Sequence, residues 1–317
     1  EADFILLIGS NPRYEATILN ARIRKAYLQN KTKIISLNDV GDLTYPYESL
    51  DGDIENIKKI TEDNHKISSL IKEAKKPLII FGQSSLKSKS AKYIVESVKS
   101  FLEKNNKISE EWNSLNTISE NASTVGSLDL GLYKTVDGSN EVLKDLENHM
   151  FEIVYLLGVD SLKFEKKNEF IIYQGSHGDK GAEIADIILP GAAYTEQNGY
   201  FTNLEGKMQK AYKASYPPED AKEDWLIINE LAEAMNHRKL FNDKDELDSS
   251  LLNQINLYIE KNKSTKSSKS ENLDFKQEIL KVNNEDYYYS NAIARASKTM
   301  FECKSAKTNL KLTGTEG

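Results

Sequence analysis

Two carboxylates in one dense stretch, Glu196 and Glu205, are the first candidates for chemistry in this sequence. A carboxyl pair can catalyse proton transfer when one member donates a proton and the other accepts it. Each carboxylate adjoins a turn, the first at Asn198-Gly199 and the second at Glu205-Gly206, and we expect both glycines to need positive φ. No further motif supports a reaction. We therefore favour two hydrogen-bond anchors for turn backbone and keep the acid–base pair as the alternative.

His177 is another candidate, as a base in the loop 175–181. No motif pairs a nucleophile with it, so a loop histidine that faces solvent is the favoured interpretation. The loop is not a Walker phosphate loop, because Lys180 is followed by Gly181 rather than by Ser or Thr. The four histidines lack metal-ligand spacing. The single cysteine, Cys303, excludes an intrachain disulfide and a cluster held by four thiolates.

Four glycines stand at the ends of apolar runs: Gly9, Gly82, Gly158 and Gly175. Glycine at the carboxyl end of a parallel strand lets backbone approach a phosphate, but it also simply eases a tight turn. We favour the second interpretation. In the first turn, Asn11 is suited to cap a helix that starts at Pro12. This turn lacks the dinucleotide fingerprint, since the next glycine is Gly41.

The elements that must position these residues alternate between strands and helices. Continuous apolar runs predict buried parallel strands at 4–8, 33–37, 78–81, 153–157, 170–173 and 187–189. Helical spacing of apolar residues predicts helices at 16–26 and 91–102. Such alternation is typical of an α/β fold with mostly parallel sheets and flanking helices.

The pattern becomes helical after about residue 216. We expect a helix from Pro218 through Met235, a second over 249–260 and a third over 291–303, with a polar linker between the last two. The predicted domains are an α/β domain at 1–215, a helical extension at 216–262, a linker at 263–283, and a C-terminal docking helix and loose tail at 284–317.

Composition sets further bounds. The chain has 317 residues with 42 Lys and Arg against 49 Asp and Glu, so its net charge is −7. This balance argues against a protein that follows nucleic-acid phosphates. No apolar run reaches the eighteen residues of a membrane span. The chain starts at Glu1 and enters a strand at Phe4, so either processing removed a leader or this is a piece of a longer protein, and we favour the second.

One stretch carries a family resemblance. The motif Ala185-Asp186-x-x-Leu189-Pro190, followed by Glu196, Gly199, Asn203, Glu205-Gly206 and Gln209, resembles the signature of the molybdopterin oxidoreductase superfamily. One departure is Lys207, where the family commonly has Arg. The segments Gly9-Ser10-Asn11-Pro12 and Leu157-Gly158-Val159-Asp160 resemble two copies of that family's strand-end loop, which suits a fold of two related halves.

Closer matches are similar to the large iron–sulfur subunit of respiratory complex I (NADH–quinone oxidoreductase). They include Asn20-Ala21-Arg22-Ile23-Arg24, the loop 174–181, and Ile293-Ala-Arg295-Ala-Ser-x-Thr-Met-x-x-Cys303 near the end. The resemblance implies a structural signature made of Gly9, Asn11, Pro12, Arg22, Gly158, Gly175, Asp179, Asp186, Pro190, Glu196, Gly199, Asn203, Glu205, Gly206 and Arg295.

The resemblance implies a structural, non-redox portion of that subunit in the hydrophilic arm of complex I, supporting electron transfer from NADH to ubiquinone. No cofactor is expected in this chain, because the family's iron–sulfur clusters belong to an N-terminal region absent here. No catalytic, cofactor-binding or metal-binding residue is expected either. We expect Arg295 either to anchor the tail to carboxylate or backbone or to lie on ordinary helix surface, and Cys303 to fill a buried apolar position.

The implied partners are other hydrophilic-arm subunits, including a cluster-bearing N-terminal portion or chain, with neither nucleic acid nor membrane insertion. The implied location is the matrix side of the mitochondrial inner membrane, or the cytoplasmic face of a bacterial membrane. Two other functions stay open. One is a fragment of a catalytic molybdopterin-dependent oxidoreductase, and the other is an unrelated nucleotide-binding α/β domain.

Overall fold

A computed structural model describes residues 1–119, 121–132, 142–160, 162, 164–235, 238–263, 273–282 and 286–312. The chain divides into two compact units, and neither is a single stretch of sequence. Unit 1 comprises residues 1–121 and 267–285, and unit 2 comprises residues 122–266 and 286–317. The boundaries of these units differ from the predicted domain boundaries, because the prediction followed changes in sequence pattern along the chain.

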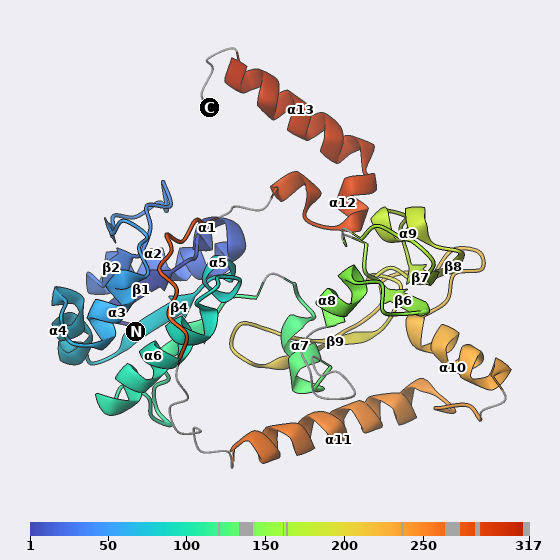
Figure 1. The fold of residues 1–317 in the computed structure, drawn as a ribbon, viewed down its shortest axis with the longest axis horizontal. Coiled ribbons are helices and arrows are strands. Elements are labelled where there is room, and N and C mark those ends of the chain that lie inside the picture. Colours follow the sequence, from blue (N-terminus) through green and yellow to red (C-terminus); the bar gives the residue numbers. More distant parts are fainter. Residues whose placement is uncertain are drawn as a thin grey trace. The chain divides into compact units, whose positions relative to one another are not determined.

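Unit 1 is built on a five-stranded parallel sheet in the order β3-β2-β1-β4-β5 (Figure 1). The strands are β1 (Phe4–Ile8), β2 (Lys33–Ser36), β3 (Glu48–Ser49), β4 (Pro77–Phe81) and β5 (Leu115–Thr117). The helices are α1 (Pro12–Glu15), α2 (Thr17–Asn30), α3 (Glu55–Thr61), α4 (Lys66–Glu73), α5 (Gln83–Leu86) and α6 (Ala91–Lys104).

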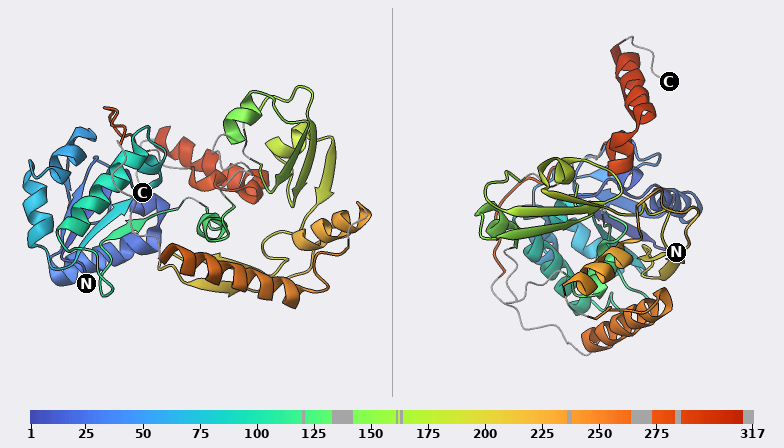
Figure 2. Two further views of the ribbon diagram at one scale, coloured as in Figure 1. Left: turned by 60° about the horizontal axis from the view of Figure 1, so that its bottom comes forward. Right: turned by 90° about the vertical axis from the view of Figure 1, so that its right-hand side faces the viewer.

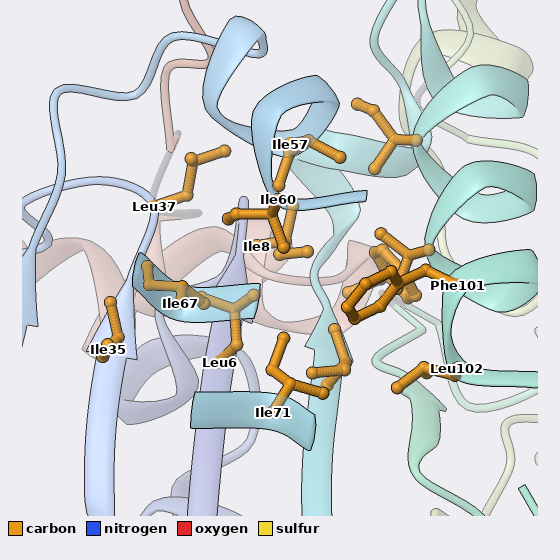
Figure 3. Close-up of a cluster of buried hydrophobic side chains, with 14 of the residues drawn as sticks. Leu6, Ile8, Ile35, Leu37, Ile57, Ile60, Ile67, Ile71, Phe101 and Leu102 are labelled. Carbon is orange, nitrogen blue, oxygen red and sulfur yellow. The ribbon is translucent and has the colours of Figure 1, made fainter. Parts of the chain in front are cut away.

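Both faces of this sheet are covered, because its strand order reverses at β1 and sends crossovers to either side. Alternate residues of β1 explain the two cores. Leu6 and Ile8 face α3, α4 and α6 (Figure 3), whereas Ile5 and Leu7 pack in a second cluster with Ile23 of α2. Burial of all five β1 side chains fits the continuous apolar run that predicted this strand.

A return segment, residues 273–282, completes unit 1 after the chain has passed through unit 2. Leu280 is buried in the first core, its N–H donates to the carbonyl of Gly52, and its carbonyl accepts from Asn38 Nδ2. Phe275 stacks edge-on against Tyr93. The segment falls within the predicted linker 263–283, yet Phe275 and Leu280 pack against the first core. The most polar part of that linker, 264–272, lies outside the described residues.

Unit 2 contains a three-stranded parallel sheet in the order β6-β7-β8 and a two-stranded antiparallel sheet of β9 and β10. The strands are β6 (Ile153–Leu157), β7 (Phe170–Gly175), β8 (Ile187–Pro190), β9 (Gly199–Thr202) and β10 (Met208–Ala211). The helices are α7 (Thr124–Asp129), α8 (Val142–Glu147), α9 (Lys180–Ile184), α10 (Asp224–Ala234), α11 (Lys244–Lys263), the short η1 (Tyr287–Tyr289), α12 (Ala292–Ala296) and α13 (Lys298–Leu312).

Two helix predictions in unit 2 are corrected. Helix α10 begins at Asp224 rather than near Pro218, since Glu219 has φ +46° and Lys222 exchanges backbone hydrogen bonds with the end of β8. The helix expected over 291–303 is two helices, because the extended backbone of Ser297 separates α12 from α13. The loose tail predicted after residue 312 lies outside the described residues. No helix of the described part has the length and apolarity needed to cross a bilayer.

Candidate sites at the strand ends

The first candidate ligand site lies between the carboxyl ends of β1 and β4, where the strand order of unit 1 reverses. Gly9 follows β1 with φ +61°, and Gly82 follows β4. The two loops contact each other directly. A Cβ placed on Gly82 would lie 2.3 Å from the carbonyl oxygen of Gly9, and one on Gly9 would lie 2.6 Å from the backbone nitrogen of Ser85. Both glycines therefore allow the two loops to pack directly against each other, backbone against backbone.

The polar groups of this turn are satisfied within the chain. The Asn11 side chain accepts from the N–H of Arg13, which caps α1 at Pro12 as predicted, and it donates to the carbonyl of Val40. Glu15 accepts from the N–H of Asn11 and from the hydroxyl of Ser10. Ser10 and Asn11 are almost fully buried. The turn thus serves as a folded junction between β1, α1 and the loop at residue 40.

The second candidate site lies at the carboxyl ends of β6 and β7 in unit 2. Gly158 follows β6 with φ +63°, nearly the value at Gly9, so the two predicted copies of the strand-end loop share a backbone conformation. Asp160 follows Gly158, and Asp179 follows β7 as the residue before α9. Both carboxylates are held by one guanidinium, that of Arg295.

This cluster of Arg295, Asp160 and Asp179 is called here the arginine clamp. The Nε of Arg295 donates to Asp179 at 2.5 Å, and its Nη2 forms an ion pair with Asp160 at 3.0 Å. Its Nη1 donates to the carbonyl of Tyr289 at 3.2 Å. Arg295 is therefore an anchor for the C-terminal element of unit 2 rather than ordinary helix surface, and its planar fork reaches two carboxylates at once.

The electrostatics of the arginine clamp follow from this geometry. The hydrogen bond from Arg295 lowers the pKa of Asp179 below its usual range. Burial raises the pKa of the neighbouring Tyr173, and the charges of Asp160 and Asp179 raise it further. The Tyr173 hydroxyl stays a donor and bonds the carbonyl of His177 at 2.7 Å, which fixes the loop beside the clamp.

The motif segment 185–209 is held by hydrogen bonds to its own backbone and to β7. Asp186 accepts from the N–H of Ile171 at 2.8 Å and pairs with Lys166 at 2.6 Å, and these contacts lower its pKa. Pro190 ends β8 opposite Gly175. The carbonyl of Pro190 accepts from the N–H of Lys222, which joins the segment to the approach of α10.

The turns of this segment confirm part of the carboxylate interpretation. Glu196 accepts from the N–H of Ala193 at 2.9 Å, so it anchors backbone as expected, but in the turn at residues 194–196 rather than at Asn198-Gly199. Glu205 is exposed, and among the described residues no contact joins the two carboxylates. Asn203 Oδ1 accepts from the N–H groups of Glu205 and Lys207, so this asparagine organises the second turn.

The expectation of positive φ is confirmed at Gly206 and wrong at Gly199. Gly206 has φ +74° in the turn between β9 and β10. Gly199 is instead the first residue of β9, paired with Ala211, and its φ is outside the left-handed region. A Cβ at this position would meet only Phe201, at 3.8 Å. The Asn-Gly pair was misread as a turn because the strand starts one residue earlier than its apolar residues.

The remaining titratable candidates show no catalytic arrangement. His177 Nδ1 contacts only its neighbour Ser176, at 3.0 Å, in the described part of the chain, so no carboxylate orients it as a base. Cys303 is exposed on α13, which corrects the expectation of a buried position. His237 lies outside the described residues. Within those that are described, no group of three His, Cys, Asp or Glu side chains could hold a metal ion.

Sequence reasoning missed a network around Asp224. Gln174 and Gln197 both donate to its carboxylate, at 2.8 and 2.9 Å, and its own N–H donates to Gln197 Oε1. The network ties β7, the motif segment and the start of α10 together. In the sequence, Asp224 is only an acidic residue at the start of a helix, and this pattern is too common to predict a network. Arg22 adds nothing to either site, since it lies on the exposed side of α2.

Comparisons with known proteins agree along the chain. Residues 1–234 match the family model of molybdopterin oxidoreductase, and residues 255–303 match the model of the C-terminal region of the NADH-ubiquinone oxidoreductase G subunit. The NADH-ubiquinone oxidoreductase 75 kDa subunit of Reclinomonas americana is 38% identical over 317 residues, which cover 96% of this chain and 45% of that protein. The NADH-quinone oxidoreductase G subunit of Rickettsia bellii is 36% identical, covering 99% and 45%.

A fungal relative extends the pattern. The mitochondrial NADH-ubiquinone oxidoreductase 78 kDa subunit of Candida albicans is 34% identical, and the match covers 96% of this chain and 43% of that protein. The chain thus spans less than half the length of the relatives it matches, while almost all of its own length takes part in each match.

Proposed function

The chain belongs to the molybdopterin oxidoreductase family, and from this premise we propose that it serves as the structural, non-redox C-terminal portion of the large iron–sulfur subunit of complex I. The observation that carries the proposal is the match of almost its whole length to subunits of NADH-ubiquinone and NADH-quinone oxidoreductases, together with the match to the model for the C-terminal region of the G subunit. In this role it supports electron transfer from NADH to ubiquinone within the assembled enzyme without carrying electrons itself.

The family name raises the question of a molybdenum-bearing pterin dinucleotide, and the residues present do not fit one. At the first strand-end site, a Cβ on Gly82 would meet the carbonyl of Gly9, so this glycine serves the contact between two loops of the chain rather than the approach of a pyrophosphate. At the second site, a phosphate would meet the carboxylates of Asp160 and Asp179, which already bind a guanidinium. These contacts favour a chain that binds no cofactor of its own.

The proposed partners are other subunits of the hydrophilic arm, among them the portion that bears the iron–sulfur clusters. Relatives of this chain are named as subunits of NADH-ubiquinone or NADH-quinone oxidoreductase in mitochondria and in a bacterium. We propose as its location the matrix side of the mitochondrial inner membrane, or the cytoplasmic face of a bacterial membrane.

Purification in native form tests the proposal. The chain should be isolated under mild detergent with whatever it binds, the partners identified by mass spectrometry, and molybdenum, pterin and iron measured. We expect a separate or covalently continuous cysteine-rich portion with iron, and pterin far below one per chain. Stoichiometric pterin would instead support a fragment of a catalytic molybdopterin enzyme. Saturable binding of a free nucleotide by calorimetry would support an unrelated nucleotide-binding domain.

A further inference from the structure

The parallel sheet of unit 2 has one apolar face that its own connections do not cover. Its strands follow one another in the order β6-β7-β8. Crossovers between parallel strands are right-handed, so two successive crossovers in one direction lie on the same side of a sheet. Both do so here. Leu162 and Phe164 of the first crossover and Ala182 and Ile184 of the second pack in one cluster.

That cluster identifies the covered face. It contains Leu156, Ile171 and Tyr173 from the strands, and Figure 2 shows α9, in yellow-green, on one side of the sheet. Strand residues alternate between faces, so their neighbours in sequence point to the other side. The sheet of unit 1 differs, because its order reverses at β1 and gives it crossovers on both sides.

The opposite side is named here the open face. The register forms three rows across the strands. Ile153 lies beside Phe170; Tyr155 lies beside Ile172, which lies beside Ile187; and Leu157 lies beside Gln174, which lies beside Leu189. Its seven apolar residues are Ile153, Tyr155, Leu157, Phe170, Ile172, Ile187 and Leu189.

The exposure of the open face is large for a parallel sheet. Ile153 is 65% exposed, Leu157 46%, Ile187 45% and Phe170 43%. The start of α10 reaches this face at Gln174, which is fully buried and bonded to Asp224. Parallel sheets occur almost only with both faces covered, and a contiguous apolar patch of this kind marks an interaction surface.

We propose that the open face binds an apolar helical surface contributed by the part of the complete subunit that lies outside residues 1–317. This inference rests on the proposed function. The occupant is argued from length, because more than half of each relative falls outside its match with this chain. It is argued also from chemistry. The rows of the open face carry no charged side chain, and Gln174, their one polar residue, is already bonded. A helix with an apolar stripe supplies the missing layer.

The first experiment places charge on the open face. Ile153→Glu and Ile187→Glu are introduced together in the tagged chain, which is co-expressed with the rest of the subunit as a separate polypeptide, and the co-purified rest is quantified by mass spectrometry. Ile18→Glu is the matched control, since Ile18 is an isoleucine 77% exposed on α2 of unit 1. We expect recovery to fall by at least about tenfold for the double variant, because an uncompensated carboxylate is costly to bury, and to stay unchanged for the control.

A second experiment does not depend on the folding of a charged variant. Ile187→Cys in a Cys303→Ser background leaves one thiol in the chain. Its maleimide labelling rate is measured in the isolated chain and in the complete complex. We expect at least about tenfold protection in the complex, because a thiol covered at an interface reacts only when the interface opens.

The outcomes separate this inference from the proposed function. If the unmodified chain recovers no other portion of the subunit, the proposed function fails and this inference with it. If assembly is normal but the double variant assembles equally well, or the thiol labels equally fast in the complex, only the inference is overturned. A dimer of the unmodified chain in sedimentation, dissolved by the double variant, would assign the open face to a second copy and overturn it as well.

Discussion

Replacement of Arg295 by alanine removes the guanidinium that holds two carboxylates of unit 2. The change leaves the backbone of α12 intact, since in its first turn the N–H groups of Ala294 and Arg295 donate to the side-chain and backbone oxygens of Asn291. What is lost is the pair of charged contacts to Asp160 and Asp179 and the bond to the carbonyl of Tyr289. The expected effect is a weaker attachment of α12 to the carboxyl ends of β6 and β7.

The magnitude follows from burial. A hydrogen bond to a charged group contributes about 1.5–3 kcal/mol when buried, whereas an exposed ion pair contributes about 0–1 kcal/mol. The Arg295 side chain is 28% exposed and its two carboxylate partners are each 20% exposed, so the clamp lies between these limits. At about 1 kcal/mol for each of the two charged contacts, Arg295→Ala weakens the attachment of α12 by about 2 kcal/mol. This lowers the ratio of docked to undocked α12 about thirtyfold.

Hydrogen exchange in α12 measures this ratio. We expect exchange of the amides of residues 294–296 to accelerate about thirtyfold in Arg295→Ala and about fivefold in Arg295→Lys, whose single ammonium holds one carboxylate. Lys298→Ala is the control, because Lys298 is 90% exposed and pairs only with Glu302 of its own helix in the described structure. Exchange rates within twofold of the native chain for Arg295→Ala would refute the reasoning, as would equal acceleration in the control.

Other perturbations give further tests. Acidification should weaken the clamp: the pKa of Asp179 is lowered in the folded chain, so its contribution is complete above the unfolded value of about 3.9 and is lost as pH falls through the folded value. A melting temperature whose acid decline is unchanged by Asp179→Asn would argue otherwise. Gly82→Ala should destabilise unit 1 by about 1–3 kcal/mol, because the added methyl group clashes with the carbonyl of Gly9. A denaturant midpoint equal to the native one would contradict close contact between these two loops. Gly206→Val should cost about 1–2 kcal/mol for left-handed backbone, while Gly199→Val should melt like the native chain; equal losses would restore the turn interpretation.

The strands were predictable because their signal is local. The runs at 4–8 and 153–157 are continuous, apolar and closed by glycine, and they coincide with β1 and β6. The short strands β3 and β5 escaped prediction. Their sequences, Glu-Ser and Leu-Asn-Thr, are polar, and each is a strand only because an established strand offers it a parallel edge.

The site was harder to predict than the fold because its contacts are distant in sequence. Asp179 and Arg295 both stood in the predicted signature, but nothing in their spacing tells that they meet across 116 positions. Asp160 belongs to a resembling segment but carries no signal of its own, and the sequence around Asp224 gives no sign of its network. The spacing of residues in the sequence predicts which side chains share one helix or strand. The ion pairs of Arg295 instead depend on α12 returning to the ends of β6 and β7.

The return segment has a consequence for how the chain is made. Unit 1 uses Leu280 to finish its first core, to accept a hydrogen bond from Asn38 Nδ2 and to donate one to the carbonyl of Gly52, groups synthesised more than two hundred positions earlier. Proteins emerge from the ribosome N-terminus first, at about 5–20 residues per second. The first 121 residues therefore leave the ribosome well before their last packing partner does. During that interval the part of the first core that Leu280 later covers stays exposed.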